Sequence, residues 1–156
     1  MTAIDTPSEV VTTGIGPPYS GYLAAIGDAD SVQAANRAFY DAFERRDLDA
    51  MSDLWEHSER VLCTHPGWAT LRGWPAVASS FFALFQGQGQ LQFLLTGEHV
   101  EVAGEMAWVS VEENLLGDHG GATVAALNLF TREGGGGWRV LAHHGSSVVA
   151  PPALVE

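Results

Sequence analysis

The sequence predicts an α+β domain in which a curved antiparallel sheet and three helices enclose a pocket. Apolar residues recur at helical spacing in the first half of the chain. The second half instead consists of long strand-forming runs separated by short glycine-rich turns. Helices that come first and hairpins that follow are typical of an α+β arrangement, with the helices covering one face of the sheet.

The helices are expected in the first half of the chain. The first begins near Asp30, and its apolar stripe includes Phe39 and Phe43 at four-residue spacing. Asp47 is placed to cap a second, shorter helix. Pro75 suits the first turn of a third helix, where a missing N–H leaves no hydrogen bond unmade.

Five strands are expected, and the last four form an antiparallel meander because short turns join them. They cover residues 60–64, 91–102, 106–116, 123–132 and 138–149.

The 156 residues, of which 46% are hydrophobic, suit one domain. We place this domain at residues 30–150. Residues 1–29 lack periodicity and are expected to form an extended arm, and residues 151–156 form a short tail.

The strand that contains Glu113 predicts a carboxylate directed into the molecule. Side chains alternate between the faces of a strand, so Glu113 shares a face with Ala107, Val109 and Val111. A carboxylate in apolar surroundings often lines a cavity, where desolvation raises its pKa. The alternative is that Glu113 lies at the strand end and reaches water. Glu112, on the other face, is expected to meet solvent or an interface.

Three further polar residues are candidates for the same pocket. Asn128 interrupts an apolar strand and needs hydrogen-bond partners, as a structural or a ligand-orienting amide. His143 and His144 are adjacent and so point to opposite faces, which allows only one of them to enter the pocket. His65 ends the first strand, at the start of a loop. Each histidine also has a structural interpretation, in which packing and hydrogen bonds alone explain it.

Aromatic and apolar residues of the helices, loops and strands are expected to form the pocket walls, with two tryptophans at its mouth. The expected lining residues are Phe39, Tyr40, Phe43, Trp68, Trp74, Phe82 and Val111.

Composition excludes several classes of partner. Seven basic and 19 acidic residues give a formal net charge of −12, whereas binding to nucleic acid or an anionic membrane requires a basic surface. No apolar run approaches the roughly 18 residues of a membrane helix, and no signal peptide is recognisable. The single cysteine, Cys63, cannot form an internal disulfide. We therefore expect a cytoplasmic protein.

A metal site is not expected. His65, Glu113 and His143 are ligand types of a two-histidine, one-carboxylate site, but no H-x-H or H-E-x-x-H spacing accompanies them. A nucleotide cofactor is not expected either, because the glycine run at 134–137 lies in a predicted hairpin turn rather than between a strand and a helix.

Several sequence motifs, and the order in which they follow one another, resemble those of SnoaL-like domains of the nuclear transport factor 2-like superfamily. The resemblance covers residues 31–149 and rests on the segments 35–51, 65–68, 71–74, 107–109, 128–130 and 138–141, with Glu113, His143, His144 and Ser146. It implies a cone-shaped fold around a pocket, with Glu113, Asn128 and His143 on the pocket side, and a homodimer formed through the outer face of the sheet.

The superfamily contains ketosteroid isomerases, scytalone dehydratase-like enzymes, polyketide cyclases and the hub domain of a calmodulin-dependent kinase, so the fold does not determine the function. The chain departs from the isomerases and cyclases in that no position matches their acid–base aspartate. Isomerase chemistry therefore serves only as an analogy for general acid–base catalysis in such a pocket.

Two functions remain open. In the first, the chain is a dehydratase, isomerase or cyclase without a cofactor, in which Glu113 or His143 is the general base and Asn128 and His65 hold an oxyanion or a hydroxyl group. In the second, it is a non-catalytic domain that binds a small molecule or serves assembly.

Overall fold

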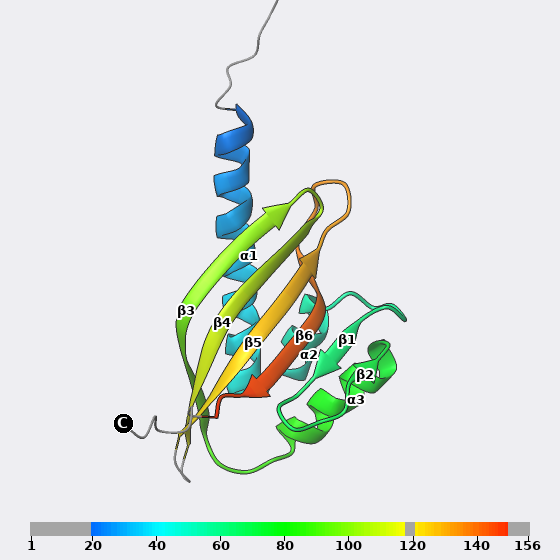
Figure 1. The fold of residues 1–156 in the computed structure, drawn as a ribbon. Coiled ribbons are helices and arrows are strands. Elements are labelled where there is room, and N and C mark those ends of the chain that lie inside the picture. The colour runs from blue at the N-terminus through cyan, green and yellow to red at the C-terminus, as the bar shows by residue number, and fades with distance from the viewer. Residues whose placement is uncertain (1–19, 118–120, 150–156) are drawn as a thin grey trace, which may run out of the picture.

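The computed structural model describes residues 20–117 and 121–149, which form three helices and a six-stranded curved sheet (Figure 1). The helices are α1 (Ser20–Arg45), α2 (Leu48–Leu54) and α3 (Trp74–Phe85). The strands are β1 (Leu62–Thr64), β2 (Leu71–Arg72), β3 (Leu91–Ala103), β4 (Met106–Gly117), β5 (Ala122–Thr131) and β6 (Arg139–Ser147). The predicted α+β class is confirmed.

The strand order in the sheet is β2-β1-β6-β5-β4-β3. Strands β3 to β6 form the expected antiparallel meander. Strand β1 instead runs parallel to β6, with Cys63 opposite His143, so the sheet is mixed rather than wholly antiparallel. The meander leaves one edge of β6 unpaired, and β1 supplies the hydrogen-bond partners for that edge.

Helix α1 begins at Ser20, ten residues before the expected start. The expectation of an extended arm was therefore wrong for residues 20–29, where no proline interrupts a run that contains strong helix formers. Arg132 holds this part of the helix, because its guanidinium donates to both Asp28 carboxylate oxygens at 2.6 and 2.7 Å. The rest of the arm (1–19) and the tail (151–156) lie outside the described residues.

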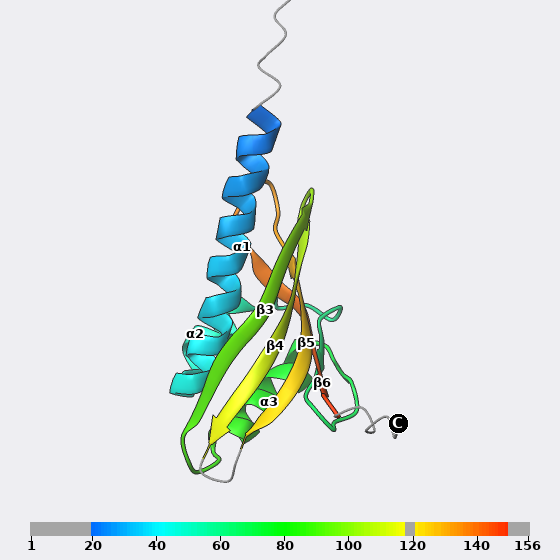
Figure 2. The ribbon, with the colours of Figure 1, turned by 60° about the vertical axis from the view of Figure 1, so that its left-hand side comes forward.

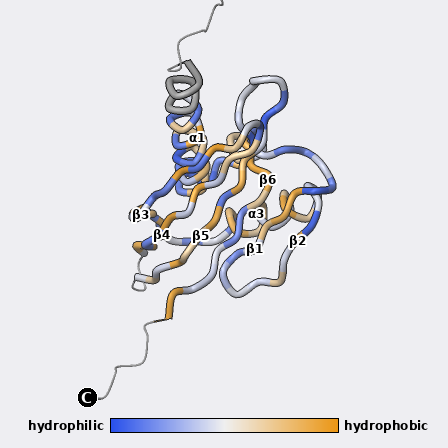
Figure 3. Tube along the Cα trace, turned by 45° about the horizontal axis from the view of Figure 1, so that its top comes forward, coloured by the Kyte–Doolittle hydropathy of each residue, from blue (hydrophilic) through white to orange (hydrophobic). Residues whose placement is uncertain are grey.

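Helices α1 and α3 lie on the concave side of the sheet, and the first turns of α1 project past the β3–β4 hairpin (Figures 1 and 2). The core between them contains the fully buried side chains of Phe39, Trp55, Phe81, Val109 and Phe130. Hydrophobic segments lie along the strands, hydrophilic residues are frequent in the connecting loops, and α1 carries residues of both kinds (Figure 3). The helices thus cover only one face of the sheet, as in other α+β domains.

Alternation along the strands decides which side chains face the helices. In β4 the burial alternates from Ala107 to Glu113, as the sequence predicts. In β3 the alternation breaks where the pairing with β4 shifts between Thr96 and His99. Gly97, with φ +62°, provides the backbone conformation of this bulge, and Glu98 consequently turns toward α1.

Candidate functional site

Three of the four predicted catalytic residues meet around one small cavity on the concave side of the sheet. Glu113 of β4, His143 of β6 and His65, directly after β1, line a cavity of about 60 Å³. The α1 residues Phe39, Tyr40 and Phe43 also line it, as expected from the sequence, together with Pro66, Leu91, Phe93 and Leu115. Residues from separate parts of the chain therefore share this cavity.

Glu113 has the electrostatic properties expected of a buried carboxyl group. Its side chain is 4% exposed, and burial raises its pKa to about 7. Tyr40 donates a hydrogen bond from Oη to Glu113 Oε1 at 2.7 Å, which stabilises the carboxylate and partly opposes the effect of burial. At neutral pH both protonation states of Glu113 are therefore present in comparable amounts.

His143 is buried and neutral. It lies opposite Asn128 on the neighbouring strand, and its Nδ1 is 2.5 Å from Asn128 Oδ1. An amide oxygen only accepts, so Nδ1 carries the proton and Nε2 is an unprotonated acceptor. Burial lowers the pKa of His143 to about 3, with smaller contributions from His65 and His144.

His65 also presents an acceptor. Its Nε2 is 2.9 Å from Ser80 Oγ, whose own hydrogen is donated to the Val77 carbonyl oxygen at 2.7 Å. Ser80 therefore accepts from Nε2–H, which leaves Nδ1 of His65 unprotonated, with the buried Cys63 Sγ atom 3.9 Å from it. Burial lowers the pKa of His65 to about 4, and its ring centre lies 6.3 Å from that of His143.

Gly145 explains how the loop after β1 comes so close to β6. A Cβ atom at this position would lie 3.0 Å from Val124 Cγ1 and 3.3 Å from Pro66 Cγ. The absence of a side chain at Gly145 lets Pro66, and with it His65, pack closely on the strand that carries His143.

The cavity adjoins a wider hollow of about 420 Å³. Phe43, His65 and Leu91 line both spaces, and Trp68 lines the outer one. The shared residues show that the two spaces are neighbours.

The structure places the other predicted lining residues elsewhere. Phe82 is 55% exposed on α3, and Trp74 stacks on His57 with ring centres 4.4 Å apart. Val111 is buried in the core and is not among the residues around the cavity. The broad apolar face of α3 did not show which of its residues turn inward.

Asn128 supports the site without reaching the cavity. Its two N–H groups donate to Asn36 Oδ1 at 2.8 Å and to Tyr40 Oη at 3.0 Å, and its oxygen accepts from His143. No donor remains for a ligand, so the expected contact of Asn128 with an oxyanion was wrong.

Sequence reasoning missed Asn36, Ser80 and Glu98 as partners of these residues. Asn36 had a detectable signal, because it lies four residues before Tyr40 on the buried face of α1. Glu98 had none, because the bulge in β3 reverses the expected alternation.

Among the residues that the structure describes, no group of three or more histidine, cysteine or acidic side chains is arranged to hold a metal ion. Within the same residues, no helix is long and apolar enough to span a membrane.

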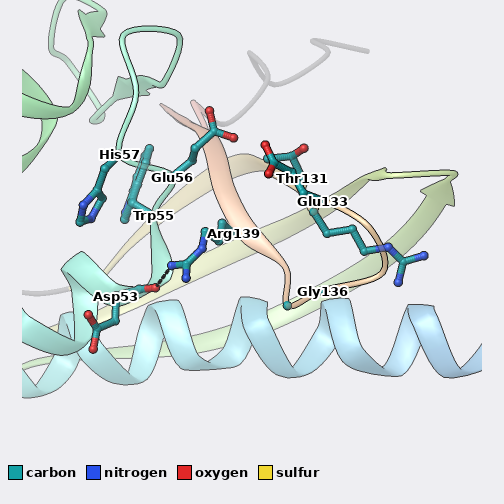
Figure 4. A pocket seen from close by; sticks show the side chains of 10 residues that line it. Asp53, Trp55, Glu56, His57, Thr131, Glu133, Gly136 and Arg139 are labelled. Atoms are coloured by element: carbon teal, nitrogen blue, oxygen red, sulfur yellow. Dashed lines mark hydrogen bonds between the residues drawn. The ribbon is translucent and has the colours of Figure 1, made fainter.

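A second hollow, of about 590 Å³, lies between the end of α2 and the β5–β6 hairpin (Figure 4). None of the predicted site residues lines it. Arg139 crosses the space and donates to the Asp53 carbonyl oxygen at 2.7 Å, and Glu56 is paired with Arg60 at 2.7 Å. Its side chains therefore show no convergence comparable to that around Glu113.

Comparison with known proteins decides the family. The model of the SnoaL-like domain matches residues 32–151. The chain belongs to this family. Among solved structures, this SnoaL-like domain is similar to an NTF2-like protein from Streptomyces avermitilis that is provisionally assigned as a dehydratase. The two are 37% identical with a TM-score of 0.74, over 80% of this chain and 99% of the other.

The SnoaL-like domain is also similar to a domain from Thiobacillus denitrificans that is provisionally assigned as a calcium/calmodulin-dependent protein kinase type II association domain. This pair is 34% identical with a TM-score of 0.68, over 75% of this chain and 94% of the other. A curated relative, F-box protein SKIP8 of Arabidopsis thaliana, is 26% identical over 83% of this chain. The chain spans only 54% of the length of that relative.

Proposed function

We propose that this SnoaL-like domain is an enzyme of the dehydratase, isomerase or cyclase type, which moves a proton on a small molecule without a cofactor. The observation that carries this proposal is the convergence of Glu113, His143 and His65 on one cavity. The similarity to a provisionally assigned dehydratase supports it.

Glu113 is the proton-transfer group in this proposal. A pKa of about 7 allows the carboxylate to remove a proton and the carboxylic acid to return it at neutral pH. In a dehydration, the carboxylate takes the proton from carbon, the C–O bond breaks, and the resulting acid protonates the departing hydroxyl group to give water.

The two histidines hold the substrate. His143 Nε2 and His65 Nδ1 are acceptors, and burial keeps both rings neutral. They therefore suit a substrate that presents a hydrogen-bond donor, such as a hydroxyl group, and they do not supply the donors that an oxyanion requires.

The test is proton exchange on carbon. The purified chain is incubated in D₂O with a panel of small β-hydroxy carbonyl compounds, and NMR follows deuterium incorporation and water loss. Glu113→Gln should lower the rate by about 10²–10⁴-fold, the usual contribution of a general base. Glu112→Gln is the control, because this neighbouring carboxylate lies on the exposed face of β4. Equal rates in wild type and Glu113→Gln would remove Glu113 from the mechanism.

A role in assembly is the second candidate. The outer face of the sheet exposes Trp108 and Leu127, which are 39% and 40% exposed, and the relative from Thiobacillus denitrificans bears the name of an association domain. A homodimer through this face would cover these side chains. Assembly and catalysis are compatible, because the cavity lies on the opposite, concave side.

A further inference from the structure

A chain of hydrogen bonds connects the cavity to a half-buried carboxylate at the edge of the molecule. Glu98, in the edge strand β3, accepts from Asn36 Nδ2 at its Oε2 at 3.0 Å and from Gln33 at its other oxygen. Asn36 Oδ1 accepts from Asn128, and Asn128 Oδ1 accepts from His143. Asn36 and Asn128 are 0% and 1% exposed, so water does not replace these partners.

Glu98, at the outer end of this series of hydrogen bonds, determines which group donates and which accepts in each of them. A carboxylate only accepts, so Asn36 must turn its NH₂ group toward Glu98 and its oxygen inward. That oxygen requires the NH₂ group of Asn128, which leaves the Asn128 oxygen facing His143. His143 must then carry its proton on Nδ1.

Asn128 also determines the donor and acceptor roles in a second series of hydrogen bonds, which runs through Tyr40 to Glu113. The Asn128 NH₂ group also donates to Tyr40 Oη, so the phenol hydrogen is directed to Glu113 Oε1. One amide therefore determines both the unprotonated Nε2 of His143 and the hydrogen bond that Glu113 receives. Networks in which every polar group is satisfied act as a unit in this way.

We propose that Glu98 and Asn36 are positioning residues, which set the tautomer of His143 and the donor direction of Tyr40 from outside the cavity. Neither residue lines the cavity, and their effect passes through Asn128. The catalytic consequence rests on the proposed function, since an Nε2–H tautomer of His143 would offer a substrate hydroxyl group a donor instead of an acceptor. The structural consequence does not depend on turnover.

The test uses ¹⁵N NMR of the histidine rings, which distinguishes protonated from unprotonated nitrogen. Wild type should show His143 protonated at Nδ1 and unprotonated at Nε2. In Glu98→Lys the side chain only donates, so both amides should reverse and the proton should move to Nε2. In Glu98→Gln an acceptor oxygen is still available to Asn36, and His143 should keep the wild-type tautomer.

Glu101→Lys is the matched control, because it makes the same charge change on an exposed residue of β3. Glu101 is hydrogen-bonded to His99 and takes no part in the hydrogen bonds between Glu98 and His143. It should leave the spectrum of His143 unchanged. An Nε2–H tautomer in wild type would overturn the proposal whether or not Glu98→Lys folds. An unchanged tautomer in a folded Glu98→Lys would also overturn it. Loss of turnover with the expected tautomers intact would instead count against the proposed function alone.

Discussion

At the scale of single residues, burial shifts the pKa values of the acidic and basic groups around the cavity in opposite directions. It raises the pKa of the acid Glu113 to about 7 and lowers the pKa values of the bases His65 and His143 to about 4 and 3. All three shifts favour the neutral form, because burial disfavours charge of either sign. The site therefore approaches neutrality although the chain carries a net charge of −12.

Glu113 should make stability depend on pH. Between its ordinary pKa of 4.5 and its folded pKa of about 7, the folded protein retains a proton that the unfolded chain has released. The stabilisation is complete below pH 4.5 and is lost as the pH rises to 7, by roughly 3 kcal/mol. Glu113→Gln lacks this effect, so its free energy of unfolding should rise relative to wild type over this range. Urea denaturation at a series of pH values measures the difference, and a pH-independent difference would contradict it.

The histidines should act in the opposite sense. Their folded pKa values lie below the ordinary 6.5, so the unfolded chain takes up protons first as the pH falls. Their contribution is complete above pH 6.5 and is lost as the pH falls through about 4 and 3. NMR titration should show the rings of His65 and His143 neutral at pH 5. Protonation of either ring above pH 6 would show that it is not desolvated as the structure implies.

At the scale of elements, strand alternation was enough to select Glu113 over Glu112 as the inward-facing residue, because β4 is regular there. In β6 the pairing with β5 shifts at Leu141, so alternation showed only that His143 and His144 face opposite sides, and the family resemblance selected His143. Alternation failed for Glu98, because the bulge at Gly97 inserts a residue that no local sequence pattern predicts. The parallel pairing of β1 with β6 was equally hidden, since it joins segments about 80 residues apart. Partners of the site residues were predictable only where regular elements place them.

Gly145 should be sensitive to the addition of a single methyl group. In Gly145→Ala the new Cβ would press on Val124 and Pro66, and overpacking of this kind costs about 1–3 kcal/mol. We expect a lower midpoint in urea denaturation and shifted NMR signals for His65. Gly137→Ala is the control, because a Cβ atom there has no neighbour within 4 Å. Equal stability of wild type and Gly145→Ala would show that the loop moves away without cost.

At the scale of the whole molecule, the sheet has two unlike faces. The concave face carries the helices (Figure 2). The outer face exposes Leu94, Trp108, Leu116 and Leu127. Apolar side chains gathered on a solvent-facing sheet are typical of an interface. The expectation of a homodimer through this face stays a prediction.

Leu127→Asp tests that prediction. A carboxylate in the middle of the outer face should prevent a dimer, because burying an unpaired charge is costly. Light scattering coupled to size-exclusion chromatography should give the dimer mass for wild type and the monomer mass for the variant. Phe82→Asp, on the exposed side of α3, should leave the mass unchanged. A monomeric wild type would contradict the prediction.

The sizes of the two connected spaces have a consequence for selectivity. The inner cavity measures about 60 Å³, whereas the outer hollow measures about 420 Å³. In the proposed function, the inner space takes a small head group such as a hydroxyl-bearing carbon, and the rest of the substrate lies against the mostly apolar outer hollow. The proposed enzyme should therefore select strictly among head groups and accept a range of carbon skeletons in the rest of the substrate. A substrate of the proposed enzyme is best sought among compounds that share one functional group rather than among molecules of one shape.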